Sequence, residues 1–406
     1  MARLNTVQAA RRLGVKPSTI YAYVSRGVLT STPSKDGRQS TFSSAEVEML
    51  ARRGRPRLAS RSRALDFTID TAITSITQHQ LSYRGHDVTS LSRSATFEQV
   101  AGLLLTGSLA EHRSWPVRAI EGVIPADLDV FDHIGLVTIL AAASDPLRND
   151  LSPGSVTQIA SALISWLVES WPTRAERGTP RLTIDDATYR STIAARLWTR
   201  MSDRRPRRGM VELLNAALVL LADHELAVST VAARVTASTR SDPYAVISAG
   251  VAAIQGPLHG GVSRPARRML EQALLRRSGP DSQRVGAERA AGEALQLHGM
   301  YPGFGHKVYK FGDPRAEALL AMLRTFSAGS REMETVDALI AAIHKRSDVR
   351  PNIDLALAAF GMVAGLPEDS GQMIFSLARI AGWSAHAIEE YAESPLRFRA
   401  RAVYIG

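Results

Sequence analysis

Helical periodicity dominates the chain from about residue 66 onward and constrains its fold more than any other feature. Apolar residues recur every three to four positions, which is the spacing of helices that bury one face. Stretches with the strict alternation of a strand are sparse. The clearest helical stretches are 97–105, 131–143, 156–171, 213–221, 246–254, 316–326, 335–344 and 373–392. We therefore predict that the main body is mainly α.

The bulk composition is that of a globular protein outside the membrane. The chain has 406 residues, of which 45% are hydrophobic and 22% charged, enough for two or three domains. It has no cysteine, which excludes disulfides, thiolate metal ligands and a cysteine nucleophile. Residues 1–7 contain no apolar leader, and the most apolar stretch, 213–228, is interrupted by three polar residues. We expect a cytoplasmic protein that makes no use of a membrane.

The formal net charge of +10 favours an anionic partner. Nucleic acid, phosphorylated cofactors and carboxylate substrates all fit this charge, and so does an arginine-rich surface that is simply solvated. The charge alone does not choose among these partners.

The first 57 residues have a different pattern from the rest. Their apolar spacing and turn residues predict a helix over 6–13, a turn, and a second helix over 19–25. A polar stretch over 30–42 predicts a hairpin, and a third helix follows over 45–52. This order is typical of a winged helix-turn-helix domain. Residues 52–63 are rich in arginine, with glycine and proline, and predict a linker.

Three histidine-bearing segments and one isolated carboxylate are the candidates for chemistry. The histidines are His224, His259 and His306, and the carboxylate is Asp354. Singly, each has a structural explanation as a cap, a turn residue or a core histidine. No two histidines stand at i, i+3 or i+4, so the spacing does not suggest a metal site. Together, two glycine-framed histidines and a separate carboxylate, with Arg315 downstream, form a set for acid–base work on a carboxylate substrate.

These segments resemble the citrate synthase family over about residues 66–406. The most specific motifs are Gly-Pro-Leu-His-Gly-Gly at 256–261 and the stretch 303–315, which ends in Asp-Pro-Arg. Further matches are residues 81–88, the Asp-His-Glu at 223–225, the Pro-Asn-Ile-Asp at 351–354, Arg379 and Arg399. The resemblance implies an all-α two-domain citrate synthase fold preceded by a small winged helix-turn-helix domain. It places the front domain at 1–58, the large domain at 59–261 and 369–406, and the small domain at 262–368.

The resemblance implies condensation of acetyl-CoA with oxaloacetate and water to give citrate and CoA. No metal and no cofactor would be needed, since the CoA thioester is a substrate. Asp354 would remove the methyl proton, His259 would donate to the thioester oxygen, and His306 would protonate the developing alkoxide. Propionyl-CoA, giving 2-methylcitrate, is an alternative, because the residues after Asp354 depart from the family pattern. A DNA-binding metabolite sensor with a synthase-like body is another.

The resemblance also implies the residues that bind substrate. Oxaloacetate would be bound by His224, Arg315, Arg379 and Arg399. By analogy Arg399 comes from the partner subunit, so a homodimer is expected. Lys307 and Lys310 would lie near the CoA phosphates, although solvated lysines are as good an interpretation.

Residues 6–21 resemble helix-turn-helix domains of the MerR and excisionase type. In such domains the second helix enters the major groove of DNA. The resemblance implies that Ser18, Thr19, Tyr21 and Tyr23 face DNA, with Lys16, Arg26 and Arg38 near phosphates. A protein-interaction module is the alternative to DNA binding.

Overall fold

The computed structural model describes residues 3–25, 29–34, 40–52, 68–109, 115, 124–125, 127–171, 192–276, 282–399 and 404. The chain divides into two compact units, Met1–Asp70 and Thr71–Gly406, and each is described by itself. The linker predicted at 52–63 lies outside the described residues from residue 53 onward.

The N-terminal unit combines three helices with a three-stranded antiparallel sheet of order β1-β3-β2. Its elements are β1 (Arg3–Asn5), α1 (Thr6–Leu13), α2 (Pro17–Ser25), β2 (Ser31–Pro33), β3 (Ser40–Ser43) and α3 (Ser44–Arg52). Asn5 and Gln8 form a reciprocal capping box at the start of α1, and Gly14 ends the helix at φ 61°. The order of helices and hairpin agrees with the sequence prediction. The additional strand β1 was not predicted.

The small core of this unit corrects one predicted side chain. Tyr23 was expected to face DNA, but it is only 7% exposed and packs among Ala9, Ile20 and the other core residues. Tyr23 lies three positions after Ile20 on α2, so both side chains point to the same buried face. Tyr21, by contrast, is 57% exposed.

The other predicted DNA-facing residues are distributed as follows. Lys16 and Ser18 are exposed and Thr19 is half-buried. Arg26 and Arg38 lie outside the described residues.

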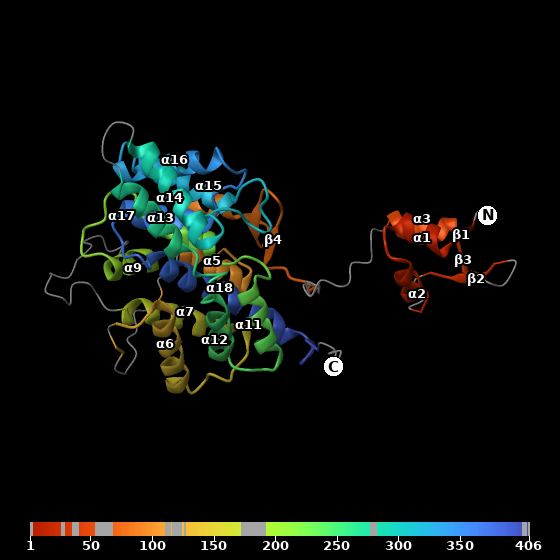
Figure 1. Ribbon diagram of the computed structural model, residues 1–406. Coiled ribbons are helices and arrows are strands. Elements are labelled where there is room, and N and C mark those ends of the chain that lie inside the picture. Colours follow the sequence, from red (N-terminus) through yellow and green to blue (C-terminus); the bar gives the residue numbers. More distant parts are fainter. Residues whose placement is uncertain are drawn as a thin grey trace. The chain divides into compact units, whose positions relative to one another are not determined.

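The second unit is mainly helical, as predicted (Figure 1). A short antiparallel sheet, order β4-β5-β6, is formed by Thr74–Ile76, Leu81–Tyr83 and His86–Asp87. The helices are α4 (Val88–Ser94), α5 (Phe97–Thr106), α6 (Val130–Ser144), α7 (Pro153–Ser170), α9 (Ile193–Met201), α10 (Met210–Leu221), α11 (Val228–Ser238), α12 (Pro243–Ile254), α13 (Ser263–Leu275), α14 (Ser282–His298), α15 (Pro314–Phe326), α16 (Arg331–His344), α17 (Ile353–Ala364) and α18 (Ser370–Ala392).

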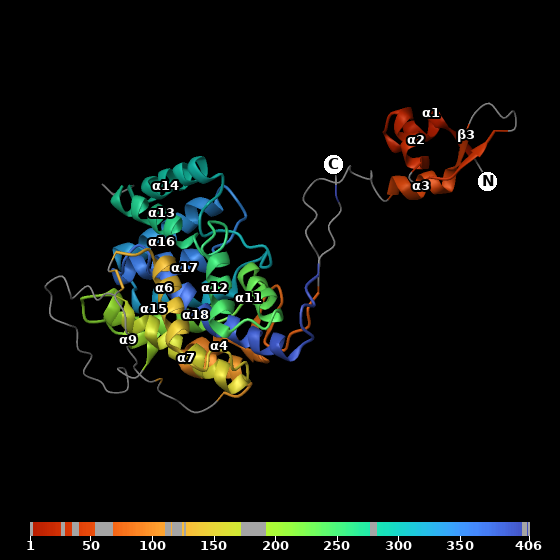
Figure 2. The same cartoon turned by 90° about the horizontal axis from the view of Figure 1, so that it is seen from below.

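Helix α18 forms the centre of this unit. It packs against α5, α7, α10, α11 and α12, and most of its 23 residues are buried. Both views show it between the cluster of α13, α14 and α16 and the helix α7 (Figure 1 and Figure 2). Trp383 of α18 lies so close to α12 that a Cβ on Gly250 would stand 2.6 Å from its ring. Because α18 is buried on all sides, its side chains lie among functional groups contributed by several other helices.

Several helices escaped the sequence prediction, and the reason is their composition. Helix α17 is apolar all round, so it shows no alternation of apolar and polar faces. Helix α14 is rich in arginine, glutamate and alanine, which weakens its apolar stripe. Within the described residues, no helix combines the length and apolar character needed to cross a membrane.

Candidate active site

A cavity of about 480 Å³ collects the residues that the motifs singled out. It is lined from the loops before α11, α13 and α15, the start of α17 and the middle of α18. Seven predicted site residues share its wall: His224, His259, His306, Lys307, Arg315, Asp354 and Arg379. The fold therefore brings together residues separated by up to 155 positions in the sequence.

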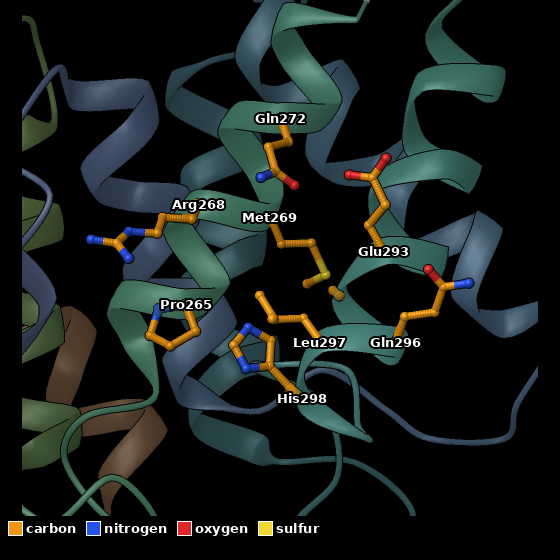
Figure 3. A pocket seen from close by; sticks show the side chains of 9 residues that line it. Pro265, Arg268, Met269, Gln272, Glu293, Gln296, Leu297 and His298 are labelled. Carbon is orange, nitrogen blue, oxygen red and sulfur yellow. The ribbon is translucent and has the colours of Figure 1, made fainter.

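A second cavity of about 480 Å³ lies between α13 and α14 (Figure 3). Met269, Leu297 and His298 face its interior, whereas the guanidinium of Arg268 points away and pairs with Glu368. Glu293 at its rim pairs with Arg276 at 2.8 Å. Volume does not distinguish the two cavities, so the chemistry of the lining decides, and only the first cavity gathers buried acid, base and cationic groups.

Asp354 is positioned by a loop that glycine makes possible. Asn352 caps α17 by accepting from the Asp354 backbone N–H at 3.0 Å, and it donates to the Gly305 carbonyl at 2.9 Å. Gly303 has φ +82°, and a Cβ there would stand 3.0 Å from the Leu355 backbone. A larger residue would therefore push the histidine loop away from the start of α17.

The carboxyl of Asp354 is buried and short of donors. It is 8% exposed, and its Oδ1 has no hydrogen-bond partner among the described residues. Burial raises its pKa to about 7, although the positive charge of Arg315 opposes this rise. A carboxyl with this pKa is poised to accept a proton near neutral pH.

Arg315 enters the cavity on a fixed support. Its guanidinium makes two parallel hydrogen bonds to Asp313, at 2.9 and 2.8 Å, and both residues are at least 98% buried. Asp313 also accepts from the Ile353 backbone N–H at 3.1 Å, which ties Arg315 to the start of α17. Arg315 and Asp354 therefore keep a constant relation to each other.

His306 is held as a neutral imidazole with a defined tautomer. Its Nδ1 accepts from the backbone N–H groups of Val308 and Tyr309, at 3.1 and 3.3 Å. Backbone N–H groups only donate, so Nδ1 carries no proton and the ring proton is on Nε2. Burial, aided by Arg315, lowers the pKa of His306 to about 4. The free Nε2–H is thus a neutral donor.

His259 is neutral for the same reason but has a side-chain partner. Its Nε2 lies 2.9 Å from the Oγ of Ser229, a fully buried hydroxyl near the start of α11. Burial lowers its pKa to about 4, and Arg379 adds to this effect. When Ser229 donates to Nε2, the ring proton resides on Nδ1.

Arg379 and His224 complete the lining of the cavity, and Arg379 adds a second buried guanidinium to that of Arg315. Arg379 is fully buried; its Nε donates to the Leu221 carbonyl at 3.0 Å, but Nη1 and Nη2 meet no acceptor in the described part of the chain. His224 lies 3.1 Å from the Tyr309 hydroxyl, and burial, then Arg315, hold its pKa well below 6.5. Two buried guanidinium nitrogens without acceptors create a strong demand for an anionic ligand.

The arrangement has a definite chemical capacity. It offers a carboxyl base near neutrality, two neutral imidazole donors and two buried guanidinium groups around one cavity. Such a set can remove a proton from carbon next to a carbonyl, stabilise the enolic oxygen, and hold a second substrate that carries carboxylates. The described residues contain no group of three or more His, Asp or Glu side chains arranged to hold a metal ion.

The residues that form this cavity all lie within the match to one known family. The model of the citrate synthase C-terminal domain matches residues 67–401, which is most of the chain. The chain belongs to the citrate synthase family.

The relatives include both citrate synthases and 2-methylcitrate synthases. The chain is 29% identical to citrate synthase 2 of Bacillus subtilis over 372 residues, covering 85% of this chain and 96% of that protein. It is 33% identical to 2-methylcitrate synthase 1 of Corynebacterium glutamicum over 183 residues, covering 44% of this chain and 46% of that protein.

Solved structures of citrate synthases share the fold. The enzyme from Thermotoga maritima superposes with a TM-score of 0.66 at 26% identity, covering 83% of this chain and 93% of that one. The Thermoplasma acidophilum enzyme, solved as a ternary complex with carboxymethyl coenzyme A and oxaloacetate, gives 0.67 at 24% identity, covering 84% and 94%. The described body is thus a mainly helical citrate synthase fold.

Not every residue matched to the family reaches the cavity. Lys307 lines it, whereas Lys310 is exposed and outside the lining, yet near enough to His306 to lower its pKa. Arg399 is exposed and does not line the cavity within this chain.

Other residues that shape the site were missed by sequence reasoning. Asp313 lies inside the 303–315 motif and Ser229 lies four residues after the 223–225 motif, but nothing in the sequence linked either residue to a partner. Tyr309 and Phe375 gave no signal beyond their aromatic character. Phe375 lies 4.9 Å from the Arg379 guanidinium and 6.2 Å from the His259 ring, so it separates two functional groups.

Proposed function

We propose that this protein condenses acetyl-CoA with oxaloacetate and water to give citrate and CoA. Its family makes the chain a transferase of the citrate synthase type. The observation that carries the proposal is the cavity in which buried Asp354, with a pKa near 7, shares a wall with two arginines and three neutral histidines. CoA thioester and oxaloacetate are both substrates, and the proposal requires no cofactor.

We assign the first step to Asp354 and His259. The carboxylate of Asp354 removes a proton from the methyl carbon of the acetyl group, and the electrons move onto the thioester oxygen. A thioester α-proton is weakly acidic, so this oxygen needs a donor. The Nδ1–H of His259 is that donor, because Ser229 engages the opposite nitrogen at 2.9 Å.

The second step forms the carbon–carbon bond. The enolic carbon attacks the ketone of oxaloacetate, and His306 donates from Nε2 to the oxygen that becomes the alkoxide. Arg315, Arg379 and His224 bind the carboxylates of oxaloacetate, since Arg379 has two unpaired nitrogens available. Water then cleaves the citryl-CoA thioester, and CoA leaves as the thiol.

Three further assignments rest on the family likeness. Arg399, exposed in this chain, would reach the cavity of a partner subunit, so we propose a homodimer. Lys307 and Lys310 would contact the CoA phosphates. The large domain would comprise 59–261 and 369–406, and the small domain 262–368 would close over the substrates.

The test is release of CoA thiol from acetyl-CoA in the presence of oxaloacetate. We expect turnover that depends on both substrates and is lost in Asp354→Ala while oxaloacetate still binds. No thiol release with either acetyl-CoA or propionyl-CoA would overturn the enzyme proposal. Oxaloacetate binding without turnover would instead favour a metabolite sensor with a synthase-like body.

A second candidate is 2-methylcitrate synthesis from propionyl-CoA. It is favoured by the likeness to the 2-methylcitrate synthases of Corynebacterium glutamicum. Side-by-side kinetics with the two acyl-CoAs separate the candidates. A kcat/KM for propionyl-CoA above that for acetyl-CoA would identify the second one.

For the N-terminal unit we propose a winged helix-turn-helix domain, residues 1–58, that binds DNA. Support comes from the helix pair α1 and α2, the β2–β3 hairpin, and the exposure of Lys16, Ser18 and Tyr21. Arg26 and Arg38 would add phosphate contacts. The full chain should shift a random DNA duplex at low salt, with weaker binding at higher salt and in Lys16→Ala. No shift at low salt would leave a protein-interaction role.

A further inference from the structure

One face of α18 holds the end of α10 residue by residue. Arg379 donates from Nε to the Leu221 carbonyl at 3.0 Å, and the Gly382 backbone N–H donates to the Ala222 carbonyl at 3.0 Å. His386 lies with its Nε2 3.3 Å from Oδ2 of Asp223. Positions 379, 382 and 386 share one face of a helix. They therefore fix three successive residues just before His224.

Asp223 is itself the support of the turn that carries His224. Its Oδ2 accepts from the Thr74 hydroxyl at 2.6 Å and from the Glu225 backbone N–H at 3.0 Å. Glu225 has φ +52°, an uncommon conformation for a residue with a side chain. The Asp223 carboxylate thus accepts a hydrogen bond from the backbone of the residue after His224. This bond stabilises the turn that directs the His224 side chain into the cavity.

The orientation of His386 follows from its second partner. Arg234 lies 3.0 Å from the His386 Nδ1, and a guanidinium can only donate. Nδ1 is therefore the acceptor, and the ring proton is on Nε2, where it faces Asp223. Arg234 is fixed in turn by Glu389 at 2.7 Å and Glu390 at 3.0 Å. Arg234, His386 and Asp223 are all fully buried.

We propose that His386 is a positioning residue for oxaloacetate: it orients Asp223, and Asp223 holds the turn that presents His224 to the substrate. The proposal rests on the proposed function of the cavity. It assigns no contact between His386 and substrate, because His386 does not line the cavity. Its loss should weaken oxaloacetate binding and leave proton removal by Asp354 unaffected.

Two substitutions of His386 separate the effects of its two hydrogen bonds, one donated to Asp223 and one accepted from Arg234. In His386→Gln the amide nitrogen can occupy the place of Nε2 and donate to Asp223. The shorter side chain of His386→Asn can accept from Arg234 but cannot reach Asp223. We expect His386→Asn to raise the KM for oxaloacetate about tenfold, the effect of about one hydrogen bond to a charged group. The kcat and the KM for acyl-CoA should stay within about threefold, which is roughly the context-dependent scatter of such effects, and His386→Gln should restore most of the oxaloacetate KM.

His133 provides the matched control. It is also a buried histidine of this unit, 2% exposed, with its Nε2 3.0 Å from the Ser170 hydroxyl on the neighbouring helix α7. His133→Asn should lower the Tm without changing the KM for oxaloacetate. A lower Tm with an unchanged oxaloacetate KM in His386→Asn would overturn the proposal, and so would an equal rise in both KM values.

A second variant keeps the proposal testable if His386→Asn does not fold. Thr74→Val removes another donor to the same carboxylate oxygen without touching α18 and should raise the oxaloacetate KM in the same direction. An unchanged KM in Thr74→Val would contradict the proposal. If the wild-type chain releases no thiol, calorimetric titration with oxaloacetate still measures the loss of affinity in either variant. Failure of the positioning role is thereby distinguished from failure of the proposed reaction.

Discussion

The end of α10 and the start of α17 each carry a buried aspartate, and the two behave in opposite ways. Asp223 is fully buried, yet its Oδ2 accepts from Thr74, from the Glu225 backbone and from His386. Burial alone would raise its pKa, but His386, Arg379 and Thr74 outweigh burial and hold the pKa of Asp223 below its usual value. In both aspartates Oδ1 is buried without a partner among the described residues, so the three donors to Oδ2 are what distinguish Asp223. Asp354 is 8% exposed, and burial raises its pKa to about 7.

The difference shows that burial does not decide what a carboxyl does. The donors around it decide. Asp223 is a fixed anion that holds backbone in place, whereas Asp354 is under-supplied with donors and therefore able to take a proton. The same unit of the protein contains a structural and a reactive aspartate, and four measurements test this distinction.

The largest expected effect is on turnover. Asp354→Asn should lower kcat by about 10²- to 10⁴-fold, the range for a lost general base. Oxaloacetate affinity, measured by calorimetry, should stay near that of the wild type. Asp223→Asn makes the same chemical change at the structural site and should reduce kcat by less than about tenfold, with its main effect on the KM for oxaloacetate. Equal losses of kcat in the two variants would erase the distinction.

The second effect concerns Arg379, whose positive charge helps to lower the pKa of Asp223. Arg379→Lys keeps the positive charge but loses the planar pair of donors, so the KM for oxaloacetate should rise by about 100-fold. Steady-state kinetics at fixed acyl-CoA measure this change. The control is Arg200→Lys, since Arg200 is a largely buried arginine paired with Glu169 at 2.5 Å and lies outside the cavity. A normal KM in Arg379→Lys would show that the carboxylates bind elsewhere.

The third effect is the pH dependence of catalysis. With a pKa of about 7, Asp354 is increasingly protonated as the pH falls, so kcat/KM should drop about tenfold per pH unit below pH 7. His259 and His306 each have a pKa of about 4, so they remain neutral between pH 5 and pH 9. They therefore add no further decline to the pH profile of kcat/KM in this range. Rates measured from pH 5 to pH 9 test this. A kcat/KM that stays constant between pH 5 and pH 7 would mean that Asp354 ionises at its ordinary pKa.

The smallest effect is on stability, and its sign differs between the two sites. Because folding raises the pKa of Asp354 from 3.8 to about 7, ionising it weakens the folded state as the pH rises through this window. Asp354→Asn should therefore raise the Tm at pH 8, by about 1–2 kcal/mol in unfolding free energy. The lowered pKa of Asp223 means that its stabilisation is present above pH 4 and is lost only as the pH falls below that value.

Asp223→Asn should accordingly lower the Tm at pH 8. The shift should correspond to about 3–5 kcal/mol, as for one partner removed from a buried ionic network. Thermal unfolding of both variants beside the wild type at pH 8 measures the two signs. Shifts in the same direction would show that the two carboxyls have similar environments.

The helical class and the candidate site residues could be predicted from the sequence. Helical spacing is a local property, so it predicted α5, α6, α10, α15 and α18 within a few residues. The glycine-framed histidines and the Pro-Asn-Ile-Asp segment are also local, and the fold brings His259, His306 and Asp354 to one cavity. Helix α17 was not predicted, because a helix buried on every side has no polar face to reveal its period.

The chemical properties of those residues follow from their three-dimensional surroundings and could not be read from the sequence. The pair of His386 and Asp223 joins positions 163 residues apart, and no spacing in the sequence encodes it. Asp354 is an ordinary aspartate in the sequence, and its raised pKa comes from helices that exclude water around it. Tyr23 became a core residue because α2 turns that face inward. Protonation and burial depend on which atoms surround a group in space, and packing of distant segments sets those neighbours.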